Sequence, residues 1–270
     1  MTENLLEKLK NGKNIYGTCI ISPSPIWSKV VANSGLDFVF LDTEHIPMDR
    51  TELTFLCQTY SAMKISPIVR IPSPDPYLAC MAKDAGAIGV IAPYIESVEQ
   101  IRQMVGATKY RPLKGNRLQN VLNGTEVLEP ELNAYLKKYN EGSLCIINIE
   151  SVTAVENLDE LLAVPELDAV IIGPHDLSIN MGLPEQYDHP EYEKVVKEII
   201  QKARNKGIAA GIHFPGIPER QIKWMKEGVN IVLHSSDMFL FSQKLEQDIN
   251  KIKVAAGDSI AKSEDSGLAI

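Results

Sequence analysis

The sequence predicts an α/β protein, a (β/α)8 TIM barrel with an N-terminal helix and a long loop and helix insertion after strand 4. Eight short apolar runs recur along the 270 residues, most of them followed by a helical pattern. The interiors of these runs, such as residues 38–41 and 169–172, are continuously apolar, which is typical of parallel strands buried on both faces. An open doubly wound sheet is the alternative, but no Gly-x-Gly-x-x-Gly follows the first run.

The order of elements supports a closed barrel, because strands and helices alternate along the chain. Leu5, Leu6 and Leu9 share one helical face and predict a short N-terminal helix. Several helical patterns stop at a glycine, as helices do when the residue after the last turn is left-handed. The expected strands are residues 15–21, 37–41, 67–71, 88–92, 145–149, 168–172, 208–212 and 230–233, and the main expected helices are 25–34, 51–63, 76–85, 96–107, 130–139, 190–206 and 218–227.

One stretch interrupts the alternation. More than fifty residues, 93–144, separate the fourth and fifth strands. After the expected helix, residues 110–142 read as a long loop with one helix at 130–139, and long loops in compact barrels are often functional covers. We expect residues 1–253 to form a single barrel domain and the polar residues 254–270 to form a loosely ordered tail.

Composition excludes several classes of protein. Lys and Arg number 27 against 35 Asp and Glu, a net charge of −8, which argues against a nucleic-acid partner. No apolar run approaches the roughly 18 residues that cross a bilayer, so no membrane partner is expected. The first ten residues are too charged for a signal peptide, and the four cysteines form no Cys-x-x-Cys pair. The sequence therefore predicts a cytoplasmic protein.

Chemically useful side chains follow the expected strands, at the end of a barrel where active sites lie. Four of the five histidines occur at this rim. The rim residues are Asp42, Glu44 and His45 after strand 2, Arg70 ending strand 3, Asn148 and Glu150 on strand 5, Gly173, Pro174, His175 and Asp176 after strand 6, His213 on strand 7 and His234 on strand 8.

Glu150 and Asp176 form a candidate metal site. They follow adjacent strands, which lie about 4.8 Å apart, and Asn148 shares the inward face with Glu150. Two such carboxylates would repel each other, and a hard divalent cation removes that cost. Mg²⁺ or Mn²⁺ suits a site with only two carboxylates and open positions for water and substrate. Two alternatives remain: Asp176 as a helix N-cap, and a glycosidase carboxylate pair, which the 2 Trp and 6 Phe support poorly.

His45 is a candidate base. Its acidic neighbours Asp42 and Glu44 can orient the imidazole and stabilise its cation. Asp84 is a further candidate partner, since it lies in the last turn of its helix, where the helix dipole disfavours a negative charge. The competing interpretations are a structural histidine and an exposed carboxylate.

Arg70 ends a buried strand, so its guanidinium must meet a protein carboxylate or an anionic ligand. A planar fork near a metal suits a substrate carboxylate or a developing enolate. His175 and His213 either line the pocket or are structural. Arg117, in the turn after Gly115, either reaches over the rim as a second anion contact or is a solvated loop residue.

Taken in order, these residues resemble the HpcH/HpaI aldolase family of the phosphoenolpyruvate/pyruvate barrel superfamily. The resemblance runs from about residue 15 to residue 245. The chain has Asn148 where the family typically has Gln, and His175 where it has a small residue. The matching segments are Asp42-Thr43-Glu44-His45-Ile46-Pro47, Val69-Arg70-Ile71-Pro72, Asp84-Ala85-Gly86-Ala87, Ile149-Glu150 and Gly173-Pro174-His175-Asp176-Leu177-Ser178.

The resemblance implies a class II, metal-dependent pyruvate aldolase. By position, Glu150 and Asp176 would bind Mg²⁺ or Mn²⁺, with Co²⁺ as another candidate and no organic cofactor. His45 would be the base, and Asp84 would raise its basicity, with a contact across subunits as one route. Family barrels assemble as homo-oligomers, commonly hexamers. Arg70 would stabilise the enolate, and the substrate would contact Arg70, Asn148, Gly173, Pro174, His175 and Asp176.

The expected reaction is cleavage of a 4-hydroxy-2-oxo acid to pyruvate, or a close 2-oxo acid, and an aldehyde. A Schiff-base mechanism is the chemical rival, but no lysine stands at an expected strand end. Two other functions stay open. One is citramalyl-CoA-type lysis or another superfamily reaction on a 2-oxo or acyl-CoA substrate, and the other is a catalytically silent barrel used for binding.

Overall fold

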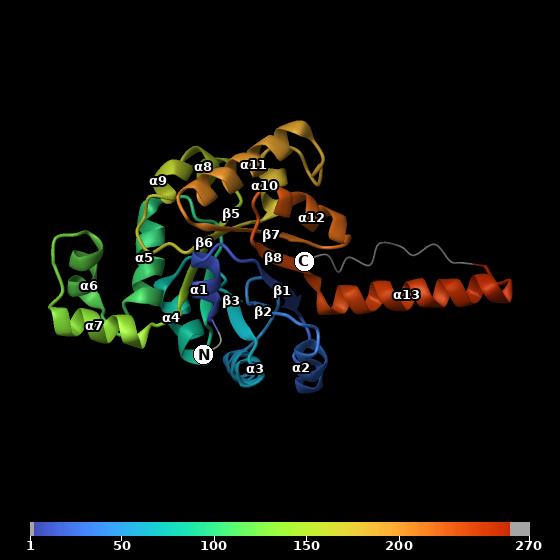
Figure 1. The fold of residues 1–270 in the computed structure, drawn as a ribbon, viewed down its shortest axis with the longest axis horizontal. Coiled ribbons are helices and arrows are strands. Elements are labelled where there is room, and N and C mark those ends of the chain that lie inside the picture. The colour runs from blue at the N-terminus through green and yellow to red at the C-terminus, as the bar shows by residue number, and fades with distance from the viewer. Residues whose placement is uncertain (1–2, 260–270) are drawn as a thin grey trace.

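Eight parallel strands close into one barrel in the order β1 to β8 (Figure 1). The computed structural model describes residues 3–259. Each strand lies within three residues of its expected ends, and the predicted (β/α)8 fold is confirmed. The strands are β1 (Ile15–Ile20), β2 (Phe38–Asp42), β3 (Ser66–Arg70), β4 (Gly89–Ala92), β5 (Leu144–Ile149), β6 (Ala169–Ile172), β7 (Ala209–Phe214) and β8 (Ile231–Ser236).

The helices surround this barrel, and the short N-terminal helix is present with a capping box on Asn4. Five helices were not expected from the sequence: α6, α8, α9, α10 and α13. The full set is α1 (Leu5–Lys10), α2 (Pro25–Ala32), α3 (Arg50–Ala62), α4 (Pro76–Ala85), α5 (Val98–Lys109), α6 (Gly115–Leu122), α7 (Pro130–Tyr139), α8 (Val152–Glu156), α9 (Leu158–Leu161), α10 (Pro174–Asn180), α11 (Pro190–Asn205), α12 (Pro218–Lys226) and α13 (Asp237–Ala256).

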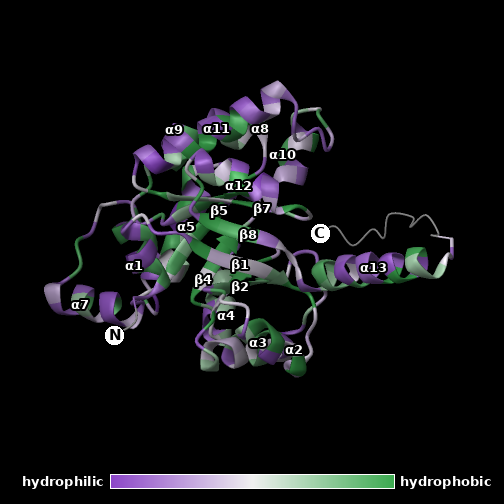
Figure 2. Cartoon of the chain, turned by 45° about the vertical axis from the view of Figure 1, so that its right-hand side comes forward, coloured by the Kyte–Doolittle hydropathy of each residue, from purple (hydrophilic) through white to green (hydrophobic). Residues whose placement is uncertain are grey.

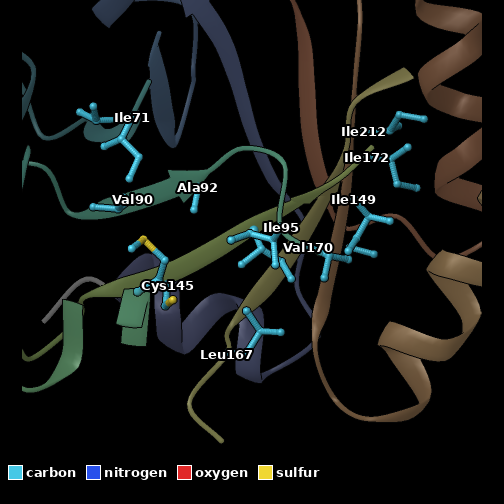
Figure 3. Packing of buried hydrophobic residues seen from close by; sticks show 14 of the residues in the cluster. Ile71, Val90, Ala92, Ile95, Cys145, Ile149, Leu167, Val170, Ile172 and Ile212 are labelled. Atoms are coloured by element: carbon cyan, nitrogen blue, oxygen red, sulfur yellow. The ribbon is translucent and has the colours of Figure 1, made fainter. Parts of the chain in front are cut away.

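The core has two layers, which explains why the strands read as unbroken apolar runs. Alternate strand residues such as Phe38 and Ile146 point into the barrel, while their neighbours, such as Val39 and Ile147, pack against the helices. Figure 3 shows part of the outer layer, where side chains from neighbouring strands pack together. Both faces of each strand are therefore covered, as the continuous runs predicted.

The insertion lies between α5 and β5, so it stands at the end of the barrel where strands begin. Helices α6 and α7 extend beside α5 (Figure 1). At the same end, Lys109 at the C-terminus of α5 forms an ion pair of 2.5 Å with Asp168, just before β6. The long loop was expected to be a functional cover, as long loops in compact barrels often are. The connection that contains it runs from α5 to β5, so it leaves and re-enters the barrel at the end opposite Glu150.

Helix α13 follows β8 and projects away from the barrel in both views (Figures 1 and 2). Its start is fixed by Asp237, whose buried carboxylate accepts hydrogen bonds from the backbone N–H groups of Ile21 and Ser22, at 3.0 and 3.1 Å, and of Met238. The helix continues to Ala256, so residues 254–256, which the sequence placed in the tail, are helical. The rest of the expected tail, from residue 260, lies outside the described residues.

Within residues 3–259, no helix combines the length and the apolar character that a membrane crossing requires. The cytoplasmic location stays a prediction.

Candidate active site

Glu150 and Asp176 lie near each other at the C-terminal end of the barrel, and Tyr94 contacts both. Glu150 follows β5, and Asp176 lies in the first turn of α10 after β6. The Tyr94 backbone N–H donates to Glu150 Oε1 at 2.6 Å, and its phenol O–H donates to Asp176 Oδ1 at 3.3 Å. The N-cap of α10 is Gly173, so Asp176 is not the cap that the alternative interpretation proposed.

Asn148 and Gly173 complete the surroundings of Glu150. Asn148 Nδ2 donates to Glu150 Oε2 at 3.0 Å, while Asn148 Oδ1 is buried without a hydrogen-bond partner among the described residues. A Cβ on Gly173 would lie 2.4 Å from Glu150 Oε2, so glycine leaves the space that the carboxylate occupies. Asn148 Oδ1 is therefore an acceptor next to Glu150 that a donor or cation could satisfy.

The protein alone does not neutralise Glu150. Its side chain is 2% exposed. Burial raises the pKa of Glu150 to about 7, and the nearby Asp176 charge adds to the rise, against the hydrogen bond from Tyr94 and the attraction of Arg70. A positive charge bound beside this carboxylate would favour its ionised form.

Arg70 is held by carboxylates from the neighbouring strand. Its Nε and Nη2 donate to the two oxygens of the fully buried Asp42 at 2.8 and 2.6 Å, and Nε lies 3.2 Å from Glu44 Oε2. The guanidinium also lies 5.4 Å from the Phe40 ring centroid. The register β2–β3 pairs Asp42 with Arg70 directly, so the fork is set by the sheet.

His45 stands at the exposed edge of this group. Its side chain is 51% exposed, and Nε2 lies 3.8 Å from Glu44 Oε2. Burial raises the pKa of Glu44, while Arg70 and His45 oppose that rise. Glu44 therefore links the arginine to the imidazole, and His45 is accessible to a ligand entering from solvent.

His213 belongs to the wall of the site. Its Nε2 lies 3.2 Å from the Ser235 carbonyl oxygen, which can only accept, so Nε2 carries the hydrogen. Its ring lies 5.7 Å from that of Phe40. Burial lowers the pKa of His213 to about 4, so the ring is neutral at pH 7. This geometry favours the structural interpretation over proton transfer.

The structure places two candidates, Asp84 and Arg117, away from the carboxylate pair, whereas His175 adjoins Asp176 and its side chain faces Glu185. Asp84 lies at the opposite end of the barrel from His45, is largely exposed, and pairs with Arg111. Arg117 does not reach the rim, because it lies on α6 in the insertion and pairs with Glu126 and Glu129. His175 is 63% exposed, and its Nε2 lies 3.7 Å from Glu185 Oε1.

The remaining α10 residue, Pro174, is buried at the first position of the helix. Proline suits this position because its fixed φ angle matches the helix and the first N–H has no helical partner. Pro174 thereby fixes the turn that carries Asp176.

One buried lysine was not anticipated. Burial lowers the pKa of Lys83 to about 7, a value that would suit an amine nucleophile. Lys83 Nζ, however, donates to the carbonyl oxygens of Ala87 and Ile88, at 2.6 and 2.9 Å, in the turn before β4. It is therefore at the end of the barrel opposite Glu150 and does not serve a Schiff base there.

Sequence reasoning also missed Tyr94, which follows β4 and has a left-handed φ of 45°. A bulky residue in this conformation costs of order 1–3 kcal/mol and is found mostly where function requires it. The available signal was its place directly after a strand end, where every other rim candidate was found.

The comparisons with known proteins identify the family of this chain. The HpcH/HpaI aldolase/citrate lyase family model matches residues 19–243. The chain belongs to the HpcH/HpaI aldolase/citrate lyase family. It is 30% identical over 258 residues to the 2-keto-3-deoxy-L-rhamnonate aldolase of Salmonella gallinarum (strain 287/91 / NCTC 13346), covering 95% of each chain. This membership makes it an enzyme of the aldolase and lyase type, as predicted.

Solved structures give the same result. An HpcH/HpaI aldolase from Desulfitobacterium hafniense DCB-2 is 26% identical with a TM-score of 0.81, over 98% of this chain and 100% of that chain. A citrate synthase, SbnG, is 28% identical with a TM-score of 0.81, over 95% and 100%. The two neighbours thus carry the names of different enzymes, an aldolase and a citrate synthase.

The neutral His213 predicts a pH dependence of stability. Its pKa is about 4 in the folded protein and near 6.5 when unfolded, so the unfolded chain binds more protons between these values. The free energy of unfolding should fall by about 2–3 kcal/mol more in the wild type than in His213→Gln as pH drops from 7 to 4. Urea unfolding at both pH values measures this, and equal losses in the two proteins would contradict it.

Proposed function

We propose that the protein is a metal-dependent aldolase that cleaves a 4-hydroxy-2-oxo acid to pyruvate, or a close 2-oxo acid, and an aldehyde. The single observation that carries the proposal is the buried Glu150 beside Asp176 and the unpartnered oxygen of Asn148. Its relatives include a 2-keto-3-deoxy-L-rhamnonate aldolase, whose named substrate is itself a 4-hydroxy-2-oxo acid.

A divalent cation fits the residues present. The donor set of Glu150, Asp176 and Asn148 Oδ1 consists of oxygen atoms only, which hard cations such as Mg²⁺ and Mn²⁺ prefer. The site offers only two carboxylates and one amide oxygen, and among residues 3–259 no group of three or more His, Cys, Asp or Glu side chains is placed to hold a metal ion. The cation would therefore keep positions for water and for the substrate's carboxylate and ketone oxygens. When bound, it would supply Lewis-acid polarisation of the 2-oxo acid.

The chain's own residues account for the proton and the developing charge. His45, exposed at the rim, takes the proton of the 4-hydroxyl group as the C3–C4 bond breaks. The electrons of that bond form the C2–C3 double bond of the pyruvate enolate, and the aldehyde leaves. Arg70, fixed by Asp42, donates to the enolate oxygen, and a proton then returns to C3.

Exchange of the methyl protons of pyruvate in D₂O tests this function. Enolate formation should exchange these protons in the presence of Mn²⁺ and stop when EDTA removes the metal. Glu150→Gln should lower the exchange rate by at least about 10²-fold, the effect expected when a preorganised charged group is lost. NMR follows the loss of the methyl signal, and exchange that proceeds equally with EDTA would contradict the proposal.

Arg70→Lys tests the enolate contact while preserving the charge. Lysine cannot reproduce the bidentate fork on Asp42, so its ammonium group would be misplaced relative to the enolate. We expect kcat to fall by about 10²–10³-fold with the fold retained. Alanine is a poorer choice, because it would leave the fully buried Asp42 without its partner and destabilise the protein. Steady-state kinetics with circular dichroism would decide, and near-normal kcat would remove Arg70 from the mechanism.

We also propose that the enzyme is a homo-oligomer, in which α13 packs on a second copy of this chain. Along α13, Met238, Phe241, Leu245, Ile249 and Ile252 repeat at helical spacing and are at least 40% exposed. The helix that would close the barrel over β1 and β8 instead projects outward (Figure 2), and Tyr16 on β1 is 42% exposed. Exchange of α13 between two copies would cover both surfaces.

Assembly also offers a route for Asp84. In one chain this carboxylate cannot reach His45, because α4 carries it to the opposite end of the barrel. A neighbouring subunit could bring it there, which is the role that the family resemblance implied.

Sedimentation velocity tests the proposed interface. The wild type should sediment as an oligomer, and Leu245→Glu with Ile249→Glu should shift it toward the monomer, because two charges would be buried in an apolar contact. Gln243→Glu with Gln247→Glu adds the same charges on the other side of α13 and should leave the oligomer intact. A monomeric wild type would refute the assembly.

A further inference from the structure

Tyr94 donates hydrogen bonds to both carboxylates of the proposed metal site, which no other residue within 3–259 does. It lies after β4, whereas Glu150 follows β5 and Asp176 lies on α10 after β6. Its backbone N–H reaches Glu150 Oε1 at 2.6 Å, and its phenol reaches Asp176 Oδ1 at 3.3 Å. One residue from a third strand end therefore spans the two acidic side chains.

The left-handed backbone makes this span possible. At a φ of 45°, the chain turns so that the N–H of Tyr94 faces Glu150. The residues on either side, Pro93 and Ile95, are buried, and Ile95 is fully enclosed in the outer core. The packing of these neighbours fixes a conformation that tyrosine alone would not favour.

The two contacts leave each carboxylate with lone pairs for a ligand. The tyrosine phenol occupies one direction on Asp176 Oδ1 and leaves Oδ2 unengaged by it. Glu150 accepts one hydrogen bond on each oxygen, from Tyr94 and Asn148, although each oxygen has two lone pairs. The side chains are thus oriented but not saturated, as residues around metal ligands commonly orient them.

We infer that Tyr94 is a positioning residue that holds Glu150 and Asp176 in the arrangement a divalent cation requires, through its main chain on one side and its phenol on the other. The inference rests on the proposed function, because it assigns a role at the same carboxylate pair. It adds that the segment after β4, and not only the two carboxylates, contributes to cation affinity.

Removal of the phenol oxygen gives the first test. Tyr94→Phe keeps the ring and the backbone and loses only the hydrogen bond to Asp176. Mn²⁺ titrated into the metal-free protein and followed by electron paramagnetic resonance should bind about tenfold more weakly, the usual loss when an orienting partner of a ligand is removed. Tyr135→Phe makes the same chemical change on an exposed residue of α7, at the other end of the barrel, and should bind Mn²⁺ as the wild type does.

Kinetics distinguish positioning from a general loss of structure. For Tyr94→Phe, the Mn²⁺ concentration that gives half-maximal activity should rise about tenfold, while kcat at saturating Mn²⁺ should stay within about threefold of the wild type. A damaged fold would instead lower kcat at every Mn²⁺ concentration.

Two further variants test the backbone contact. Tyr94→Gly tolerates the left-handed φ and lacks only the side chain, so its Mn²⁺ affinity should match that of Tyr94→Phe. Tyr94→Val disfavours that φ and should bind Mn²⁺ more weakly than either. If the valine variant does not fold, the comparison of glycine with phenylalanine still decides, because a much weaker glycine variant would show that the ring itself, and not only the phenol hydroxyl, holds the carboxylates, which contradicts the assigned role.

The outcomes separate this inference from the proposed function. If the wild type binds Mn²⁺ and Glu150→Gln does not, while Tyr94→Phe binds as tightly as the wild type, the role of Tyr94 is overturned and the metal site stands. If the wild type itself does not bind Mn²⁺, both fail.

Discussion

The carboxylate of Glu150 is buried at the catalytic end of the barrel with too little positive charge around it. Tyr94 and Asn148 donate hydrogen bonds to its two oxygens, and Gly173 leaves the space it fills. The neighbouring Asp176 adds a like charge, and the nearest guanidinium, that of Arg70, is already committed to Asp42. Burial without full compensation is costly in a folded protein and is typical of sites that a ligand completes. A cation bound there would relieve this imbalance.

The fold could be predicted from the sequence because the barrel covers its strands on both faces. Continuous apolar runs such as residues 38–41 mark such strands, and eight of them leave few arrangements other than a closed barrel. The helices that were missed carry weaker signals. Helix α6 buries none of its residues, and α8 and α9 are only 5 and 4 residues long. Helix α13 was not expected, and nothing in its local sequence shows that a helix there leaves the barrel.

The site was predictable where strand ends determine it, and less so where loops do. Asp42, Arg70 and Glu150 lie on or next to strands, so register alone brings them to one rim. The two interpretations of Arg117 could not be separated from the sequence, because position in the sequence does not reveal which end of the barrel an insertion occupies. Tyr94 was overlooked because its role depends on a left-handed backbone and on two partners from other strands. Neither property has a signature in composition or spacing.

Helix α13 follows β8 directly, because Ser236 is both the last residue of β8 and the N-cap of α13. Asp237 in its first turn accepts hydrogen bonds from Ile21 and Ser22, which form the loop directly after β1. A displacement of this 20-residue helix would therefore act on the loop after β1, at the same end of the barrel as Glu150. A partner that binds α13 would in this way act on the C-terminal end of the barrel as well as on the helix.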